Sequence, residues 1–91
     1  MKFTIFIEEA KTLKEKKRVI RSFVDSVRNK FQISVSEVEL LEEVNHSVIG
    51  CASVSDSAVF LSRLADSIEE YAHSRYPGRI KNIEKLIEND E

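Results

Sequence analysis

Positively charged side chains concentrate in one segment of this chain. Residues 11–30 contain eight Lys and Arg residues against the two acidic residues Glu15 and Asp25, a net charge of +6, although the whole chain carries −2. A helix N-terminus already bears partial positive charge, so lysines there are mildly unfavourable unless an anion lies nearby. The cluster therefore predicts a site for phosphate or an RNA backbone, with a solvated helix face that binds nothing as the alternative. The candidate residues are Lys14, Lys16, Lys17, Arg18 and Arg21.

A helical wheel separates these five cations into two groups. Lys14, Arg18 and Arg21 point in nearly one direction, about 100° from the apolar stripe of the helix, and Lys17 lies near them. Lys16 instead falls in the sector that faces the sheet. We expect its stem to lie on apolar surface past the end of the sheet and its ammonium group to reach water.

Residue types suited to catalysis do not form a recognisable constellation. His46 is expected in a loop and His73 late in a helix, and the single cysteine, Cys51, has no evident base partner. One cysteine excludes an intramolecular disulfide and a CxxC metal site. With only Gly50 and Gly78, the chain has no glycine-rich phosphate loop. We therefore predict no catalytic residue, no metal and no cofactor, and do not expect an enzyme.

Hydrophobic periodicity predicts the elements that must position these groups. Apolar residues recur either in alternation or at helical spacing along most of the chain. Thr12 followed by Glu15 is a capping box that starts the first helix, and Ser55 or Asp56 is expected to cap the second. The predicted elements are strands at 2–8, 32–40, 48–54 and 79–88, a helix at 13–31 and a helix from the second cap to about residue 75.

The order of these elements, βαββαβ, predicts an α+β ferredoxin-like fold, with a four-stranded antiparallel sheet and two helices on one face. The alternation slips between Val35 and Val38, which indicates a bulge or an edge position for the second strand. The segment 79–88 also fits a helix; we predict a strand because the sheet needs a final partner. Residues 1–91 should form one domain whose last residues, 89–91, fray.

The second sheet face would remain uncovered. We expect a small apolar patch there, made by Phe6, Ile49 and Cys51, that would serve a homodimer or another protein partner, unless neighbouring side chains shield it. RNA-recognition motifs share this element order but place aromatic residues on the third strand. Because 48–54 contains no aromatic residue, base stacking on this face is not expected.

The chain also lacks membrane and export signals. No apolar run approaches the roughly 20 residues that span a bilayer, and no basic segment followed by a long apolar one opens the sequence. We therefore expect a cytoplasmic protein with no membrane partner.

Three segments resemble the YlxP-like family, small bacterial proteins of unknown function. The helix start 12–22 is similar to that family's Ser-Leu-Lys-Glu-Lys-Arg pattern, and 31–38 and 49–55 resemble its second and third strands. The resemblance implies a ferredoxin-like fold and, because members are often encoded beside translation-initiation and ribosome-maturation factors, an RNA or ribosome context. It implies no catalytic residues. The chain departs at 44–47, where Val-Asn-His-Ser replaces the family's common Trp-Gln-Arg-Ala and removes an aromatic and a cationic anchor.

Overall fold

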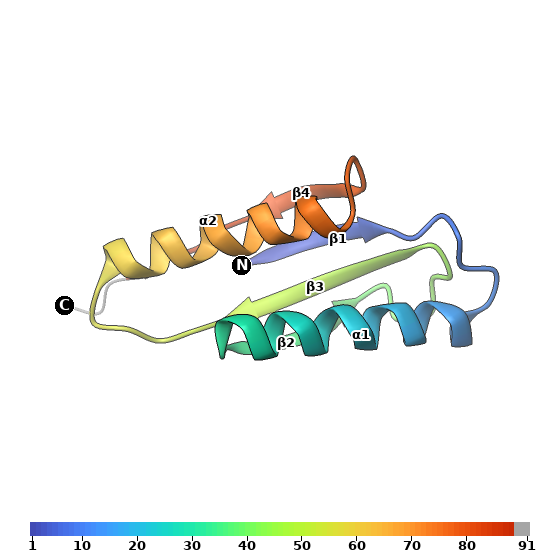
Figure 1. Ribbon diagram of the computed structural model, residues 1–91, viewed down its shortest axis with the longest axis horizontal. Helices are drawn as coiled ribbons and strands as arrows, with labels where there is room; N and C mark the ends of the chain where they lie inside the picture. Colours follow the sequence, from blue (N-terminus) through green and yellow to red (C-terminus); the bar gives the residue numbers. More distant parts are fainter. Residues whose placement is uncertain (89–91) are drawn as a thin grey trace.

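A four-stranded antiparallel sheet with two helices forms the protein, in a computed structural model that describes residues 1–88 (Figure 1). Neighbouring strands follow the order β2-β3-β1-β4, and every neighbouring pair is antiparallel. The predicted ferredoxin-like fold is confirmed, whereas the predicted fraying of 89–91 lies outside the described residues. The elements are β1 (Lys2–Phe6), α1 (Leu13–Phe31), β2 (Ser34–Glu39), β3 (His46–Ala52), α2 (Ala58–Arg75) and β4 (Ile80–Glu84).

Side-chain hydrogen bonds to backbone N–H groups determine where both helices begin. The Thr12 hydroxyl accepts a hydrogen bond from the Glu15 backbone N–H at 3.1 Å, and the Glu15 carboxylate accepts one from the Lys11 N–H at 3.2 Å. The predicted capping box therefore forms. The second helix starts later than predicted, because Ser57 rather than residue 55 or 56 provides the cap to the Phe60 N–H.

The strand predictions hold, with shifted boundaries. β2 is an edge strand and its register against β3 shifts between Glu37 and Glu39, so both features expected from the slipped alternation are present. The ambiguous C-terminal segment forms β4, which pairs with β1 but is shorter than the predicted 79–88. Asn82 in this strand has a φ of 55°, and the register against β1 is irregular there.

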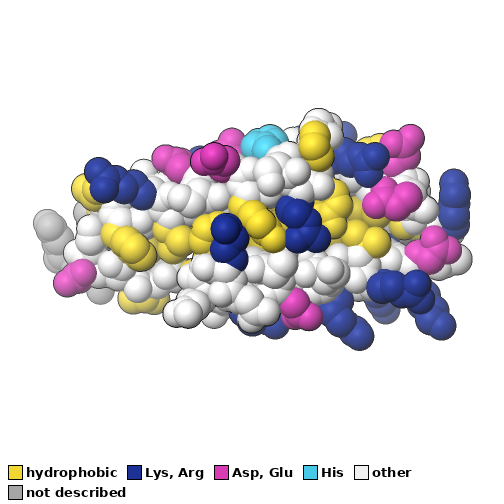
Figure 2. Space-filling model, viewed as in Figure 1, with side chains coloured by type: hydrophobic (Ala, Val, Ile, Leu, Met, Phe, Trp, Pro, Cys, Tyr) yellow, Lys and Arg dark blue, Asp and Glu magenta, His cyan; other side chains and the backbone are white. Residues whose placement is uncertain are grey.

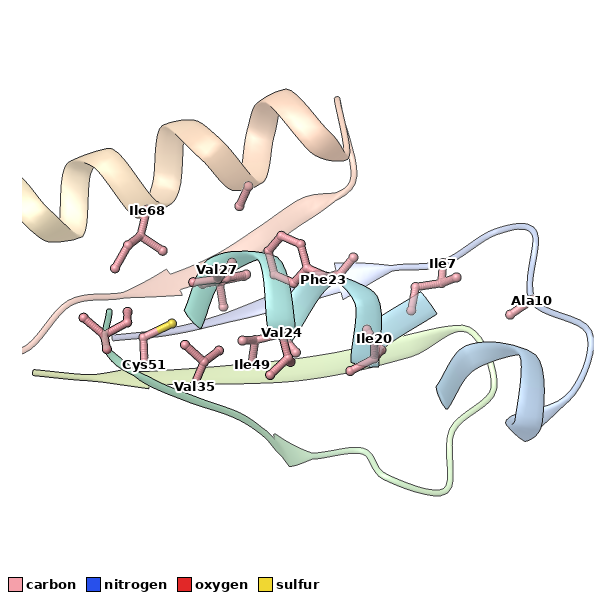
Figure 3. Packing of buried hydrophobic residues seen from close by; sticks show 14 residues of the cluster. Ile7, Ala10, Ile20, Phe23, Val24, Val27, Val35, Ile49, Cys51 and Ile68 are labelled. Carbon is pink, nitrogen blue, oxygen red and sulfur yellow. The ribbon is translucent and has the colours of Figure 1, made fainter. Parts of the chain in front are cut away.

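The core fills the space between the sheet and the helices, and it contains two residues that we had predicted on the open face. Ile49 is 0% exposed and Cys51 is 8% exposed; both pack with core residues of the helices (Figure 3). The prediction was wrong because Ile49 pairs with the core residue Phe3, and alternate residues of a strand share a face. Phe6 does lie on the open face, opposite His46, with the two rings 5.2 Å apart.

Long side chains cover the middle of the open face. Thr4 and Val48 are each only 8% exposed although no helix covers them. Lys2 reaches from β1 to Glu39 at 2.6 Å and to Glu84 at 3.8 Å, which spreads its stem over this face. Such shielding by neighbouring strands is the alternative that the sequence left open.

Candidate functional site

The five predicted cations of α1 separate into one buried and four exposed residues. Lys16 is 0% exposed, and its ammonium group lies beneath the β2–β3 hairpin. It donates to the carbonyl oxygens of Leu40 at 2.8 Å and His46 at 3.1 Å, with Leu41 O at 3.4 Å, and pairs with the Glu37 carboxylate at 2.9 Å. The three protons of the ammonium group thus have protein acceptors.

Lys16 therefore does not reach water as we had expected, although the wheel placed it correctly toward the sheet. The expectation was wrong because the β2–β3 hairpin covers the first turns of α1 and supplies acceptors for the ammonium group. The Glu37 carboxylate that neutralises Lys16 also accepts a hydrogen bond from the Ser47 hydroxyl at 2.6 Å. With its charge enclosed, Lys16 is not available to an external anion in this structure.

The remaining four cations lie together on one flank of α1, and we call them the basic stripe. They line a shallow open depression of about 620 Å³ together with Ser22 and Asp25. Within residues 1–88, none of the four forms an ion pair; Asp25 pairs instead with Arg28, at 3.4 Å. Lys and Arg side chains gather along the corresponding margin of the molecule, beside the first turns of α1 (Figure 2). The basic stripe consists of Lys14, Lys17, Arg18 and Arg21.

The backbone at the helix start contributes less to this site than its position suggests. The Thr12 hydroxyl already binds the Glu15 N–H, and the Glu15 carboxylate stands at the same helix end. A carboxylate there competes with any external anion for the partial positive charge of the helix. The candidate site is consequently the side of the first three turns of α1. Ser22 also lines it. The sequence prediction did not include this residue, although it lies one turn after Arg18.

The groups most often used in catalysis are engaged elsewhere. His73 lies 3.5 Å from Glu69 on the same helix, and His46 packs against Phe6. Burial raises the pKa of the Cys51 thiol to about 11, so the reactive thiolate is scarce at neutral pH. Across residues 1–88, no three His, Cys, Asp or Glu side chains are grouped so as to hold a metal ion.

Residues of the hairpin segment that differs from the family pattern form hydrogen bonds within the protein. Asn45 donates from its side-chain amide to the carbonyl oxygens of Ile7 and Ala10, each at 2.8 Å. Ser47 is fully buried and bonded to Glu37. Two of the four divergent positions therefore hold the hairpin: Asn45 against the segment between β1 and α1, and Ser47 through the Glu37 carboxylate that pairs with Lys16.

Neither helix in the described part of the chain is long and apolar enough to cross a membrane. The fold and the exposed stripe define a small α+β protein of the ferredoxin-like class with one basic helix flank. Residues 1–85 match the family described as "Protein of unknown function (DUF503)", and the chain belongs to that family.

A curated relative supports the resemblance seen in the sequence. The chain is 38% identical over 53 residues to "Uncharacterized protein YlxP" of Bacillus subtilis. The aligned part spans 58% of this chain and 58% of the relative, which is less than two thirds of either. No solved structure matches the chain. Membership of a YlxP-like family of unknown function is thereby confirmed.

Proposed function

We propose that the protein is a non-enzymatic module that binds the phosphate backbone of RNA through the basic stripe. The observation that carries the proposal is that the four cations share one depression and form no ion pair within residues 1–88. Elsewhere, Lys2, Lys85 and Arg79 are paired with carboxylates of the chain. Unpaired cations on an acidic protein create a local positive field that attracts and orients a polyanion.

The geometry of the stripe favours backbone contacts over base recognition. From Lys14 to Arg21 the helix rises by about 10 Å, a length that spans a few successive phosphates. The depression contains no aromatic side chain on which a base could stack. Contacts to phosphates position a protein without reading sequence, so we expect binding with little sequence preference. Because the family resemblance implies an RNA or ribosome context, ribosomal RNA is the first RNA to test.

Salt dependence is the direct test. With four phosphate contacts, the logarithm of the association constant should fall against the logarithm of salt concentration with a slope of about −3. Fluorescence anisotropy of a labelled single-stranded RNA and an RNA duplex measures this slope. Lys14→Ala, Lys17→Ala and Arg18→Ala should each weaken binding and reduce the slope by about 1.

Two exposed cations outside the stripe provide the matched controls. Arg63→Ala and Lys81→Ala remove the same charge from α2 and β4 and should leave binding nearly unchanged. Absence of binding at low salt, or equal losses in stripe and control variants, would refute the proposal.

Dimerisation through the open sheet face was the alternative from the sequence, and the arrangement of residues does not favour it. Of its three predicted residues, only Phe6 lies on that face. The face is also crossed by the Lys2 side chain with its two ion pairs. We therefore advance RNA binding alone.

A further inference from the structure

A second surface lies on the other flank of α1, between the two helices. Helices α1 and α2 run in opposite directions across the same sheet face, and a band of hydrophobic surface follows the space between them (Figure 1, Figure 2). Residues that share a helix flank recur every three or four positions, and the Tyr71–Ser26 hydrogen bond of 2.9 Å identifies the flanks that face each other. We define the interhelical groove by Val19, Ser26 and Lys30 of α1 and Leu64, Tyr71 and Arg75 of α2.

Two cations lie together in the middle of this groove. The Lys30 ammonium lies 5.5 Å from the centre of the Tyr71 ring, and the Arg75 guanidinium carbon lies 5.8 Å from it. Arg75 also donates to the Tyr71 and Ser26 hydroxyls, at 2.8 and 3.1 Å. Neither cation has a carboxylate within ion-pair distance among residues 1–88. The acidic residue on this flank of α1, Glu15, lies one turn before Val19 and accepts a hydrogen bond from the Lys11 N–H at the helix start. Two cations on an apolar band match the chemistry of a partner with carboxylates flanking an apolar stripe.

A hollow at one end of the groove could receive a large apolar side chain. It has a volume of about 230 Å³ and lies under the N-terminal half of α2, bordering the groove at Leu64. Its walls are mostly apolar and include Leu61, Ile68 and Cys51. Phe60, one helical turn before Leu64, is 53% exposed. Anchor residues of partner helices commonly fill pockets of this kind.

We propose that the interhelical groove binds an amphipathic α-helix of a partner protein that has an apolar stripe flanked by Asp or Glu. The space between two antiparallel helices suits a third helix laid along it, with carboxylates against Lys30 and Arg75 and one large apolar side chain in the hollow. This site is independent of the basic stripe, which lies on the opposite flank of α1.

Two other occupants fit the groove less well. An RNA base would need a free aromatic face, but the Tyr71 ring stacks on Phe23 at 6.2 Å and lies beneath Lys30 and Arg75. A second copy of this chain would approach with α1, whose outer flank is basic and would repel the groove cations.

The test uses the full chain labelled with nitrogen-15 and a synthetic 18-residue helical peptide with Leu at positions i, i+3, i+4 and i+7 and Glu beside them. Titration should shift the amide signals of Val19, Ser26, Leu64 and Tyr71. The same peptide with Lys in place of Glu should bind at least tenfold more weakly. Lys30→Gln combined with Arg75→Gln should weaken binding of the Glu peptide about five- to tenfold.

Arg63→Gln combined with Lys81→Gln is the matched control, because it removes two charges from exposed positions outside the groove and should leave peptide affinity unchanged. Circular dichroism verifies that each variant is folded, and Leu64→Gln provides a second variant that tests the apolar contact without altering charge. The proposal is overturned by shifts centred on the basic stripe, by equal binding of the Glu and Lys peptides or by no groove shift at millimolar peptide. RNA-induced shifts of the groove amides, or self-association that shifts the same amides, would also overturn it.

Discussion

Among single residues, Lys16 differs most from its neighbours in α1. Four other cations near it are exposed, whereas its ammonium group is enclosed by two backbone carbonyls, a third at longer range and Glu37. Breaking a buried ion pair by removing one partner leaves the other charge and its acceptors unpaired, which typically costs several kcal/mol. Lys16 therefore acts within the fold, by holding the β2–β3 hairpin against α1.

Replacing this lysine tests its structural role. We expect Lys16→Met to lower the free energy of unfolding by about 3–5 kcal/mol, because Glu37 and the hairpin carbonyls would lose their donor. Urea denaturation followed by circular dichroism measures the change. Lys17→Met, one residue along and exposed, should change stability by less than about 0.5 kcal/mol. Equal effects of the two substitutions would contradict the role of Lys16.

The Cys51 thiol should react slowly in the folded protein. Its pKa of about 11, raised by burial from 9.0, lowers the thiolate fraction at pH 8 by about 100-fold relative to an ordinary thiol. The rate of reaction with a disulfide reagent should rise about tenfold per pH unit until the pH nears that pKa. Ser36→Cys in a Cys51→Ser background, exposed on the open sheet face, is the fast-reacting control. A Cys51 rate equal to that of the control would show that the thiol is not buried.

At the scale of elements, α1 serves two surfaces and the core at once. Its sheet-facing sector packs Ile20, Phe23 and Val27, one flank presents the basic stripe, and the other borders the interhelical groove.

The segment after β4 is held against α2 by ion pairs. Lys85 pairs with Asp66 of α2 at 2.8 Å and with Glu69.

This contact should release the C-terminal segment at acid pH. The hydrogen bond from Lys85 holds the pKa of the Glu69 carboxyl below its usual value, and the same contacts raise the Lys85 pKa, led by its hydrogen bond to Asp66. A depressed carboxyl pKa means that the contact is intact at neutral pH and is lost as the pH falls through that depressed value. Amide signals of 85–87 should follow this transition in a pH titration, and Lys85→Met should abolish it. A transition that persists in the variant would assign it to another group.

At the scale of the whole molecule, both edges of the sheet are protected against pairing with another sheet. On the β2 edge, Arg28 donates to the Val35 carbonyl at 2.8 Å and the register shifts near Glu37. On the β4 edge, Asn82 interrupts the regular strand conformation. Irregular and capped edges oppose pairing with another sheet.

We therefore expect the free protein to be a monomer at the highest concentration that can be prepared. Sedimentation equilibrium measures the mass directly. A concentration-dependent dimer would contradict this expectation.

Sequence alone determined the element order, the fold class and the clustering of cations in α1, because hydrophobic period, caps and charge are local properties of the chain. It also placed Lys16 toward the sheet from helical geometry. Only the tertiary structure decided that Lys16 is enclosed, because its acceptors come from a hairpin more than twenty residues away. The same holds for Ile49 and Cys51, whose face depends on the register of β3 against β1, and for the interhelical groove, which exists only where two distant helices pack on one sheet.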